Sequence, residues 1–263
     1  MQSQRFPEFG ELPLYLERLQ FLGVQLASLL LFCVLVQSAT YLSLRTEVPS
    51  HTTELVKNGW QRVLFTTLGP PRVGLQVGHD GAAAQPLELM HLRGNTGGHA
   101  GSLTEVAINQ AVAAALATRL RQQGIIVDIL GATLPEGYRA DLLLALHADS
   151  VADSLRSGYK SAVFDPPRSW TEDTLKRTID NAYLSATGLP DDTLNITSNM
   201  RHYYAFNFRR YQHSVHPATP SLIVELGYLS NADDAGLLQR PDRVAGALST
   251  GVKAFLQRRS RLP

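Results

Sequence analysis

Short apolar runs alternate with longer helical stretches from Arg72 onward, and this alternation constrains the fold more than any other feature of the sequence. The apolar runs have the length of buried strands, and several of the helical stretches stop at a glycine. Strands are predicted at residues 73–77, 125–130, 141–146, 158–164 and 221–226, and helices at 105–123, 171–186 and 243–257. Such alternation favours a mostly parallel sheet with helices on both faces. The sequence therefore predicts an α/β domain built on a twisted sheet.

The composition narrows the chemistry that such a domain can use. The 263 residues carry 24 Lys and Arg against 23 Asp and Glu, which argues against a protein that holds nucleic acid by bulk charge. Cys33 is the only cysteine, so neither an intrachain disulfide nor a cysteine-rich zinc finger can form. Any metal ion must therefore be held by histidines and carboxylates.

A run without charged residues, 19–44, precedes the domain. About 20 apolar residues span a bilayer, so the run is long enough for a transmembrane helix. We interpret it as an uncleaved anchor, because the segment of residues 1–18 that precedes it is long for a cleaved signal peptide. A signal peptide cut after Ser38 or Ala39 and a buried helix are the alternatives. The flanking positive charges are balanced and do not decide the orientation.

These features divide the chain into four parts. Residues 1–18 are predicted to be an N-terminal segment, 19–44 a membrane anchor, 45–71 a stalk and 72–263 the α/β domain. The stalk ends in Gly69-Pro70-Pro71. Two prolines after a glycine stop a helix and favour an extended entry into the first strand.

Four ionisable side chains lie where predicted strands end or where a helix begins. His79 follows the first strand, His147 follows the third, Glu225 is near the end of the last, and Glu105 opens the first helix. Open parallel sheets place their functional sites at the carboxyl ends of the strands. Two imidazoles and one carboxylate, with an open fourth position, form the ligand set of a catalytic zinc ion. A further carboxylate is needed to take a proton from water and hand it to the leaving nitrogen, and Glu225 fits that role.

Each of these residues also has a simpler interpretation. A histidine after a glycine is a common turn residue, and Glu105 is favoured by the helix dipole. Glu225 would be a buried ion-pair partner of an arginine. An ionisable side chain on an apolar strand is costly without a partner or a task, so the catalytic interpretation of Glu225 is preferred.

Four segments in this order resemble the zinc-dependent N-acetylmuramoyl-L-alanine amidases of the Amidase_3 type, which are bacterial cell-wall hydrolases. They are Val77-Gly-His79, Thr104-Glu105, Leu146-His-Ala148 and Val224-Glu-Leu-Gly-Tyr-Leu-Ser-Asn231. The resemblance runs from about Val73 to Leu256. It implies that His79, Glu105 and His147 bind one Zn²⁺ ion and that Glu225 is the catalytic carboxylate. It also implies cleavage of the amide bond between N-acetylmuramic acid and L-alanine in peptidoglycan.

The sequence departs from the family pattern around the histidines. The usual Gly-His-Gly-Gly reads Gly78-His-Asp-Gly81, and the usual Ser-Ile-His-Ala-Asn reads Ala145-Leu-His-Ala-Asp149. The loop at residues 80–104 looks longer than is typical. None of these changes removes a ligand, but they alter the walls of the groove. The long loop is a candidate lid over the site.

Aromatic residues alternate with arginines in the stretch 201–211. Such a stretch suits sugar faces and the carboxylates of a peptide stem, so it is predicted to be a wall of the substrate groove. Packing of a long loop and stacking on nucleic-acid bases are the alternatives. The candidate substrate-binding residues are Arg201, Asn207, Arg209 and Arg210.

The substrate that the resemblance implies lies outside the membrane. The leading hypothesis is therefore a single-pass protein of the bacterial cell membrane whose residues 1–18 are cytoplasmic and whose catalytic domain, residues 72–263, lies outside and hydrolyses peptidoglycan. Secretion after cleavage of the N-terminal run is the alternative location. The expected partners are peptidoglycan and the membrane, without nucleic acid, and the need for an activator protein is left open. A zinc peptidase acting on stem or other peptides, and a non-catalytic peptidoglycan-binding module, are the alternative functions.

Overall fold

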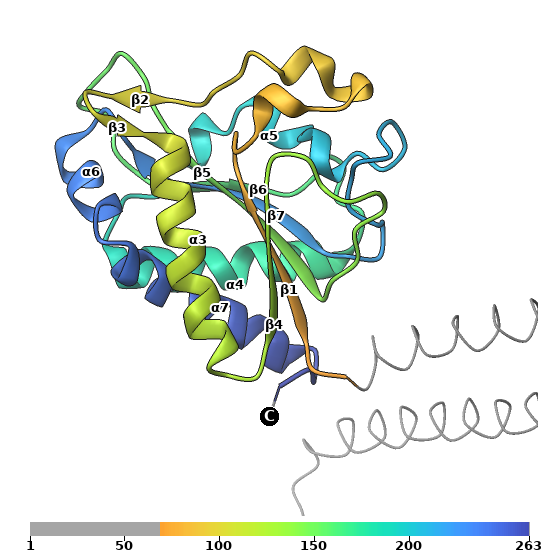
Figure 1. Cartoon of the computed structure of the whole chain (residues 1–263). Coiled ribbons are helices and arrows are strands. Elements are labelled where there is room, and N and C mark those ends of the chain that lie inside the picture. The colour runs from red at the N-terminus through yellow and green to blue at the C-terminus, as the bar shows by residue number, and fades with distance from the viewer. Residues whose placement is uncertain (1–68, 263) are drawn as a thin grey trace, which may run out of the picture. The chain divides into compact units, whose positions relative to one another are not determined.

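The computed structural model describes residues 69–262, and a five-stranded sheet lies at its centre (Figure 1). The strand order is β4-β1-β5-β7-β6, and all neighbours are parallel except β6, which runs antiparallel to β7. The strands are β1 (Arg72–Val77), β4 (Ile126–Leu130), β5 (Leu142–Asp149), β6 (Lys160–Ala162) and β7 (Ser221–Tyr228). A separate hairpin joins β2 (His99–Ala100) to β3 (Leu103–Thr104). The predicted α/β domain with a mostly parallel sheet is confirmed.

The anchor predicted at 19–44, the segment 1–18 and most of the stalk at 45–71 lie outside the described residues. Within 69–262, none of the helices combines the length and the apolar character that crossing a bilayer requires.

The helices begin and end where the sequence supplies the local signals. They are α3 (Glu105–Arg121), α4 (Trp170–Thr187), α5 (Ser198–Arg201), α6 (Ala232–Leu238) and α7 (Pro241–Arg258). The Thr104 hydroxyl caps α3 by accepting from the Ala107 N–H, and α4 ends at Gly188, whose φ of 76° is the left-handed conformation that glycine adopts without strain. Four short 3-10 helices lie in the connections, at Ala82–Ala84, Leu87–Leu92, Thr193–Asn195 and Tyr204–Phe206.

The three long helices α3, α4 and α7 pack on one face of the sheet. Alternate residues of β5 show the division: Leu142, Leu144 and Leu146 belong to the core shared with these helices, whereas Leu143 and Ala145 belong to a second core on the opposite face. This second core is covered by irregular segments, residues 134–138 and 196–215, which hold only short helices.

The prediction of helices on both faces is therefore wrong for the long helices. The reason is the connection from β4 to β5, residues 131–141, which contains no helix and contributes Leu134 and Tyr138 to the second core. That connection contains Pro135 and Gly137, both unfavourable inside a helix.

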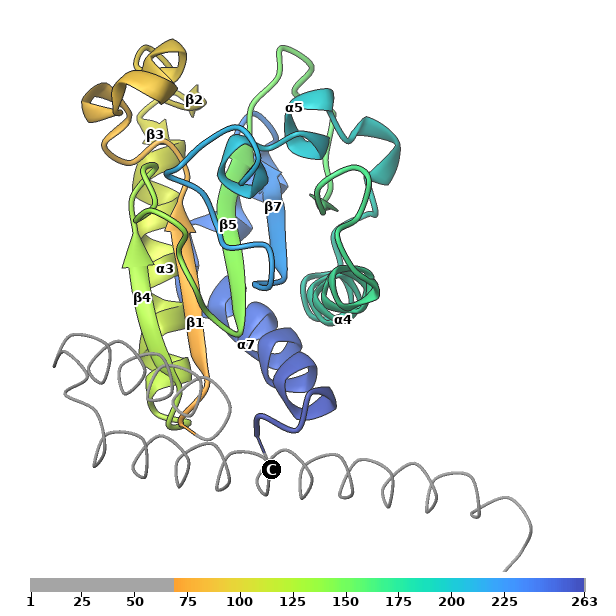
Figure 2. The same ribbon diagram turned by 90° about the vertical axis from the view of Figure 1, so that its right-hand side faces the viewer.

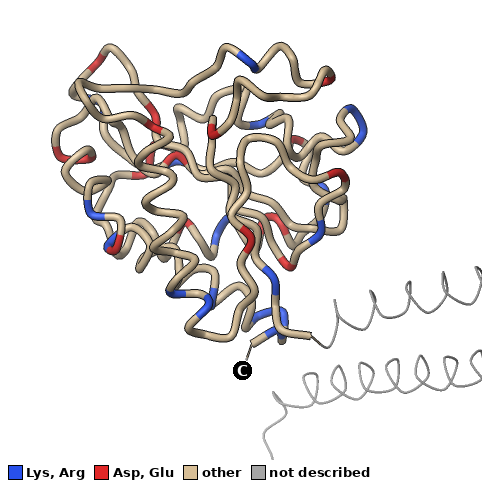
Figure 3. The backbone as a smooth tube through the Cα atoms, in the orientation of Figure 1, with Lys and Arg blue, Asp and Glu red and all other residues tan. Residues whose placement is uncertain are grey.

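The two described ends of the chain meet at the amino edge of the sheet. Arg261 forms an ion pair with Asp141 at 2.7 Å and donates a hydrogen bond to the Gly69 carbonyl oxygen, while Arg72 pairs with Asp128 at 2.7 Å. Several Lys and Arg positions, blue in Figure 3, lie near this end of the described chain. The carboxyl edge lies at the other end of the strands, beneath the β2–β3 hairpin and α5 (Figure 2). This separation leaves the carboxyl edge for a functional site.

Candidate active site

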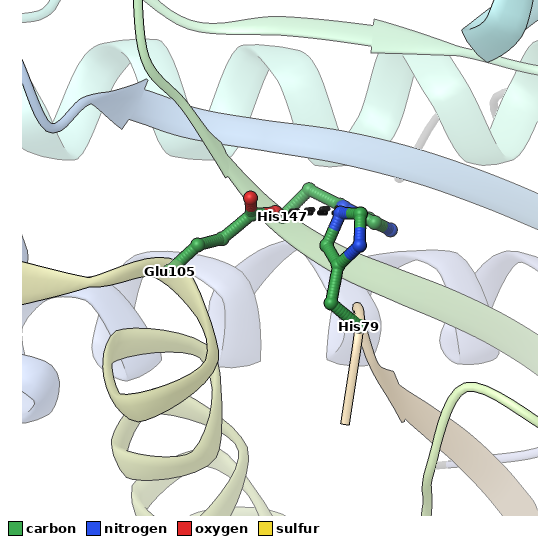
Figure 4. Close-up of side chains that lie close together, drawn as sticks. All are labelled: His79, Glu105 and His147. Atoms are coloured by element: carbon green, nitrogen blue, oxygen red, sulfur yellow. Dashed lines mark hydrogen bonds and ion pairs between the residues drawn. The ribbon is translucent and has the colours of Figure 1, made fainter. Parts of the chain in front are cut away.

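His79, Glu105 and His147 come together at the carboxyl edge of the sheet (Figure 4). His79 lies two residues beyond β1, His147 is near the end of β5, and Glu105 is the first residue of α3. Their ligand atoms all lie within 4.8 Å of one another. Glu105 Oε1 is 2.8 Å from His147 Nδ1 and 3.5 Å from His79 Nε2. Three segments that are far apart in the sequence thus direct two nitrogens and one oxygen at the same small volume.

Two glycines allow the backbone to approach these side chains. A Cβ on Gly78 would lie 2.4 to 2.6 Å from ring atoms of His147. A Cβ on Gly97, whose φ is 83°, would lie 2.9 Å from Glu105 Oε2. Both contacts are too short for a real Cβ, so the packing of the cluster depends on glycine at these two positions.

Neighbouring polar groups orient the three side chains. His79 Nδ1 lies 3.0 Å from the Asn95 carbonyl oxygen, which can only accept, so Nδ1 carries the hydrogen and Nε2 keeps its lone pair toward Glu105. The Gly98 N–H donates to Glu105 Oε2 at 2.8 Å. His147 Nε2 lies 2.9 Å from the Tyr203 hydroxyl. Such supporting hydrogen bonds are typical of metal-ligating histidines and carboxylates.

The pKa values of His79 and Glu105 are shifted in the directions that suit metal ligands. Burial lowers the pKa of His79, although the charge of Glu105 opposes the change. For Glu105, burial alone would raise the pKa, but the hydrogen bond and charge of His147 and the charge of His79 outweigh it and lower the pKa. Metal ligands must be deprotonated, and a neutral His79 with an ionised Glu105 meets that requirement. The donor set of two imidazoles and one carboxylate fits a single zinc ion.

Glu225 lies beside this cluster on β7, where it is the direct cross-strand partner of His147. Its Oε2 atom is buried and has no hydrogen-bond partner among the described residues. Burial raises the pKa of Glu225 well above its ordinary value, and the charges of Glu105 and Asp149 raise it further, whereas Lys160 lowers it. A buried carboxylate oxygen without a partner, next to a ligand cluster, is the arrangement expected of a group that exchanges protons with a bound molecule.

A cavity of about 570 Å³ opens over these residues. His79, His147 and Glu225 line it, together with residues of the loop 80–104 and of the segment 197–211. The lining side chains from these two segments are mostly polar or aromatic: Gln85, His91, Asn95, Asn199, His202, Tyr203, Tyr204, Asn207, Arg210 and Tyr211. The site is thus a polar, aromatic-walled groove above a potential metal site.

The four predicted substrate-binding residues take different positions. Asn207 and Arg210 line the cavity, and the guanidinium of Arg210 lies over the Tyr211 ring, 5.1 Å from its centroid. Arg201 and Arg209 are exposed and are not among the residues that line it. Tyr203 contacts His147 but was not singled out from the sequence, because nothing in an irregular segment indicates which aromatic residue points to the site.

The loop 80–104 is tied to the opposite wall of the cavity through Glu88. Its carboxylate accepts hydrogen bonds from the backbone N–H groups of Gln212 and His213, at 2.9 and 2.8 Å, and contacts His213 Nδ1 at 2.7 Å. Nearby, the rings of His91 and Tyr211 stack with their centroids 6.2 Å apart. The loop therefore closes one side of the cavity, and the carboxylate of Glu88 ties it to the segment at Gln212 and His213.

Replacing Glu88 with alanine is expected to loosen this loop. Three hydrogen bonds to a charged acceptor are lost, so hydrogen exchange at the Gln212 and His213 amides should accelerate by about tenfold or more. Glu136→Ala, which removes an exposed carboxylate elsewhere, is the matched control. Unchanged exchange in Glu88→Ala would show that the loop is held by other contacts.

The same contact should depend on pH. Burial alone would raise the pKa of Glu88, but the hydrogen bonds from His213 and Gln212 and the charge of His213 together outweigh it, so the pKa is lowered in the folded chain. The stabilisation is therefore present above the ordinary pKa of 4.5 and is lost as the pH falls through the lower folded value.

The fold and the site define a hydrolase-like α/β domain with a candidate metal centre at its carboxyl edge. The family model for N-acetylmuramoyl-L-alanine amidases, Amidase_3, matches residues 73–254, and the chain belongs to this family. No curated protein gives a significant match.

Solved structures show the same fold. The catalytic domain of the amidase CwlV from Bacillus (Paenibacillus) polymyxa var. colistinus is 20% identical with a TM-score of 0.50, over 71% of this chain and 98% of that one. An amidase from Clostridium difficile 630 is 18% identical with a TM-score of 0.51, and the match covers 72% of this chain and 97% of that one. The amidase Ami1 from Mycobacterium smegmatis is 17% identical with a TM-score of 0.53, and the match covers 72% of this chain and 97% of that one.

Proposed function

We propose that this protein is a zinc-dependent amidase that hydrolyses the bond between N-acetylmuramic acid and the L-alanine of the peptidoglycan stem. The observation that carries the proposal is the convergence of His79, Glu105 and His147 beside Glu225, whose buried Oε2 has no hydrogen-bond partner among the described residues, in a chain of the amidase family. A non-catalytic module would have no need for a buried carboxylate without a partner, because such a group costs stability.

His79, Glu105 and His147 would hold the zinc ion, with His79 using Nε2 because its Nδ1 hydrogen faces the Asn95 carbonyl. When bound, zinc supplies Lewis acidity toward the scissile carbonyl and the attacking water. The protein supplies the orientation of the ligands through Asn95, Gly98 and Tyr203.

Glu225 would move the proton of the reaction. Its carboxylate takes a proton from the attacking water as the new C–O bond forms, and then gives that proton to the nitrogen of L-alanine as the C–N bond breaks. A carboxyl group whose pKa is raised by burial is suited to both steps, because it can accept and release a proton closer to neutral pH.

The walls of the cavity would bind the glycan and the stem. Aromatic and histidine side chains suit sugar faces, and Arg210 and Asn207 offer donors for the carboxylates and carbonyls of a peptide. Arg201 and Arg209 would act outside the cavity, on parts of the polymer that extend beyond it.

The proposed location follows from the substrate. Peptidoglycan lies outside the membrane, so a chain anchored by residues 19–44 would present its catalytic domain on the outer side. The first described strand starts at the amino edge of the sheet and His79 lies at the far edge. A tether that enters at Arg72 would thus leave the groove facing away from its attachment point.

Analysis of the products tests the proposed function directly. The full chain, loaded with zinc, would be incubated with purified peptidoglycan and the products identified by mass spectrometry. We expect free stem peptides that begin with L-alanine, together with peptide-free glycan. Shortened stems still attached to muramic acid would instead indicate a peptidase. No products from a zinc-loaded chain would indicate either a binding module or the need for an activator protein.

A further inference from the structure

Lys160 is a buried cation on the same side of the sheet as the candidate active site. Its side chain is only 2% exposed. The Nζ atom donates to Asp149 Oδ2 at 2.5 Å and to the Tyr228 hydroxyl at 2.7 Å, and it lies 3.7 Å from Asp192 Oδ2. The Tyr228 hydroxyl in turn donates to Asp192 at 2.6 Å. None of these contacts is explained by the proposed roles of the zinc ligands or Glu225.

The sheet register places Lys160 next to the catalytic row. Glu225 on β7 has His147 of β5 as its partner on one side and Lys160 of β6 as its partner on the other. Directly opposed residues on neighbouring strands point to the same face of a sheet. His147, Glu225 and Lys160 therefore form one row across three strands.

Lys160 also joins the ends of the two strands that carry His147 and Glu225. Asp149 is the last residue of β5, and Tyr228 is the last residue of β7. The pairing of β5 with β7 shifts register between His147 and Asp149, so the ladder of backbone hydrogen bonds is locally disrupted there. The ammonium of Lys160 bridges this irregular end of the pair.

The buried charge is maintained in the folded protein. Burial alone would lower the pKa of Lys160, but the hydrogen bonds to Asp149 and Tyr228 and the charge of Asp149 outweigh it and raise the pKa. Buried ion pairs contribute little net stability compared with apolar residues of similar size. Fold stability is therefore a poor explanation for a lysine at this position.

We propose that Lys160 is a positioning residue of the amidase site, holding the ends of β5 and β7 so that Glu225 stays in place beside His147. This inference rests on the proposed function, because it assigns Lys160 to the alignment of the proton-transferring carboxylate with the metal ligands. Lys160 contacts none of the three metal ligands. It holds the strand ends through Asp149 and Tyr228, and its charge also acts on Glu225 across the row.

The test compares Lys160→Met and Lys160→Arg in the full, zinc-loaded chain. Loss of alignment by about 1 Å costs on the order of 100-fold in rate, so Lys160→Met should lower kcat by about that factor. KM and zinc content should stay close to the wild-type values, because the groove and the three ligands are intact. Lys160→Arg keeps the charge and the donors, and it should recover most of the lost kcat.

Lys176→Met is the matched control. Lys176 also forms a partly buried pair, with Asp180 at 2.6 Å, and it donates to Ser161 of the same strand β6. Ser161 neighbours Lys160 in sequence and so points to the opposite face of the sheet. Lys176→Met should therefore keep the wild-type kcat.

If Lys160→Met does not fold, as judged by circular dichroism, Lys160→Gln takes its place, since it removes the charge but keeps a hydrogen-bond donor.

Visible absorption of the Co²⁺-loaded chain gives a readout that does not depend on amidase activity. We expect the bands to shift in Lys160→Met, because the end of β5, the strand that carries the ligand His147, is no longer held through Asp149. The bands should remain unchanged in Lys176→Met. A wild-type chain that binds Co²⁺ but releases no stem peptides would refute the amidase function, while the bands still test positioning. Three results would each overturn the inference. The first is a folded Lys160→Met chain with wild-type kcat and wild-type bands, the second is loss of zinc from that chain, and the third is an equal loss of kcat in Lys176→Met.

Discussion

Glu225→Gln is expected to remove nearly all amide hydrolysis while leaving the metal bound. The amide has almost the same shape as the carboxylate but cannot take the proton of water, and general acid–base groups contribute about 100- to 10,000-fold to a rate. Glu225 lies beside the three ligands without being one of them, so zinc content should match the wild type. Turnover of a soluble muramoyl peptide and metal content, measured on the same sample, check both halves of the expectation.

Stability gives a second, independent check on Glu225. Its pKa is raised in the folded, metal-free chain, so ionisation opposes folding at any pH above the ordinary value of 4.5. Glu225→Gln removes this cost, and the metal-free variant should melt at the same temperature as the wild type or higher at pH 7. Glu136→Gln, an exposed carboxylate, should change neither turnover nor melting. Wild-type turnover in Glu225→Gln would exclude Glu225 from the mechanism.

The ligand cluster was accessible from the sequence because parallel strands end at a common edge. His79 and His147 follow apolar runs that are recognisable as strands, and Glu105 opens a helix marked by its capping threonine. The apolar run around Glu225 likewise identified β7, so the same rule places Glu225 at this edge of the sheet. Local pattern and one topological rule are sufficient for this part of the site.

The rest of the site depends on contacts that the periodicity of the sequence does not indicate. The segment 196–216 is irregular, so the sequence could not separate Asn207 and Arg210, which line the cavity, from Arg201 and Arg209, which do not. The contact of Glu88 with His213 joins segments more than 120 residues apart. Such pairs are set by packing of the two loops and not by any local preference.

The position of Lys160 could not be predicted from the sequence either, although this residue lies in a strand. It belongs to a strand of three residues, where alternation is too short to predict a face, and a lysine is normally expected in solvent. Its burial depends on Asp149 and Tyr228, which other strands deliver to the same point. The predicted helices on the second face were wrong for a related reason, because the sequence does not show which face a connection crosses.

Replacement of His79 is expected to abolish metal binding as well as activity, in contrast to Glu225→Gln. Removing a residue that merely supports a ligand costs about 10- to 100-fold in metal affinity, so loss of one of three ligands should cost at least about 100-fold. His79 has a φ of 64°, a left-handed conformation that asparagine tolerates better than alanine. His79→Asn is thus the better variant, because it removes the imidazole with less backbone strain.

The metal content of His79→Asn and its zinc affinity, measured by competition with a chelator, test whether metal binding is lost. The exposed His99, which lies outside the cluster and the cavity, gives the control variant His99→Ala. Treating the wild type with chelator should reproduce the inactivity of His79→Asn, and added zinc should restore only the wild type. A His79→Asn chain that kept both stoichiometric zinc and turnover would show that the cluster of His79, Glu105 and His147 is not the metal site. Because Glu225→Gln should retain zinc and His79→Asn should lose it, the pair of variants separates proton transfer from metal binding in the same groove.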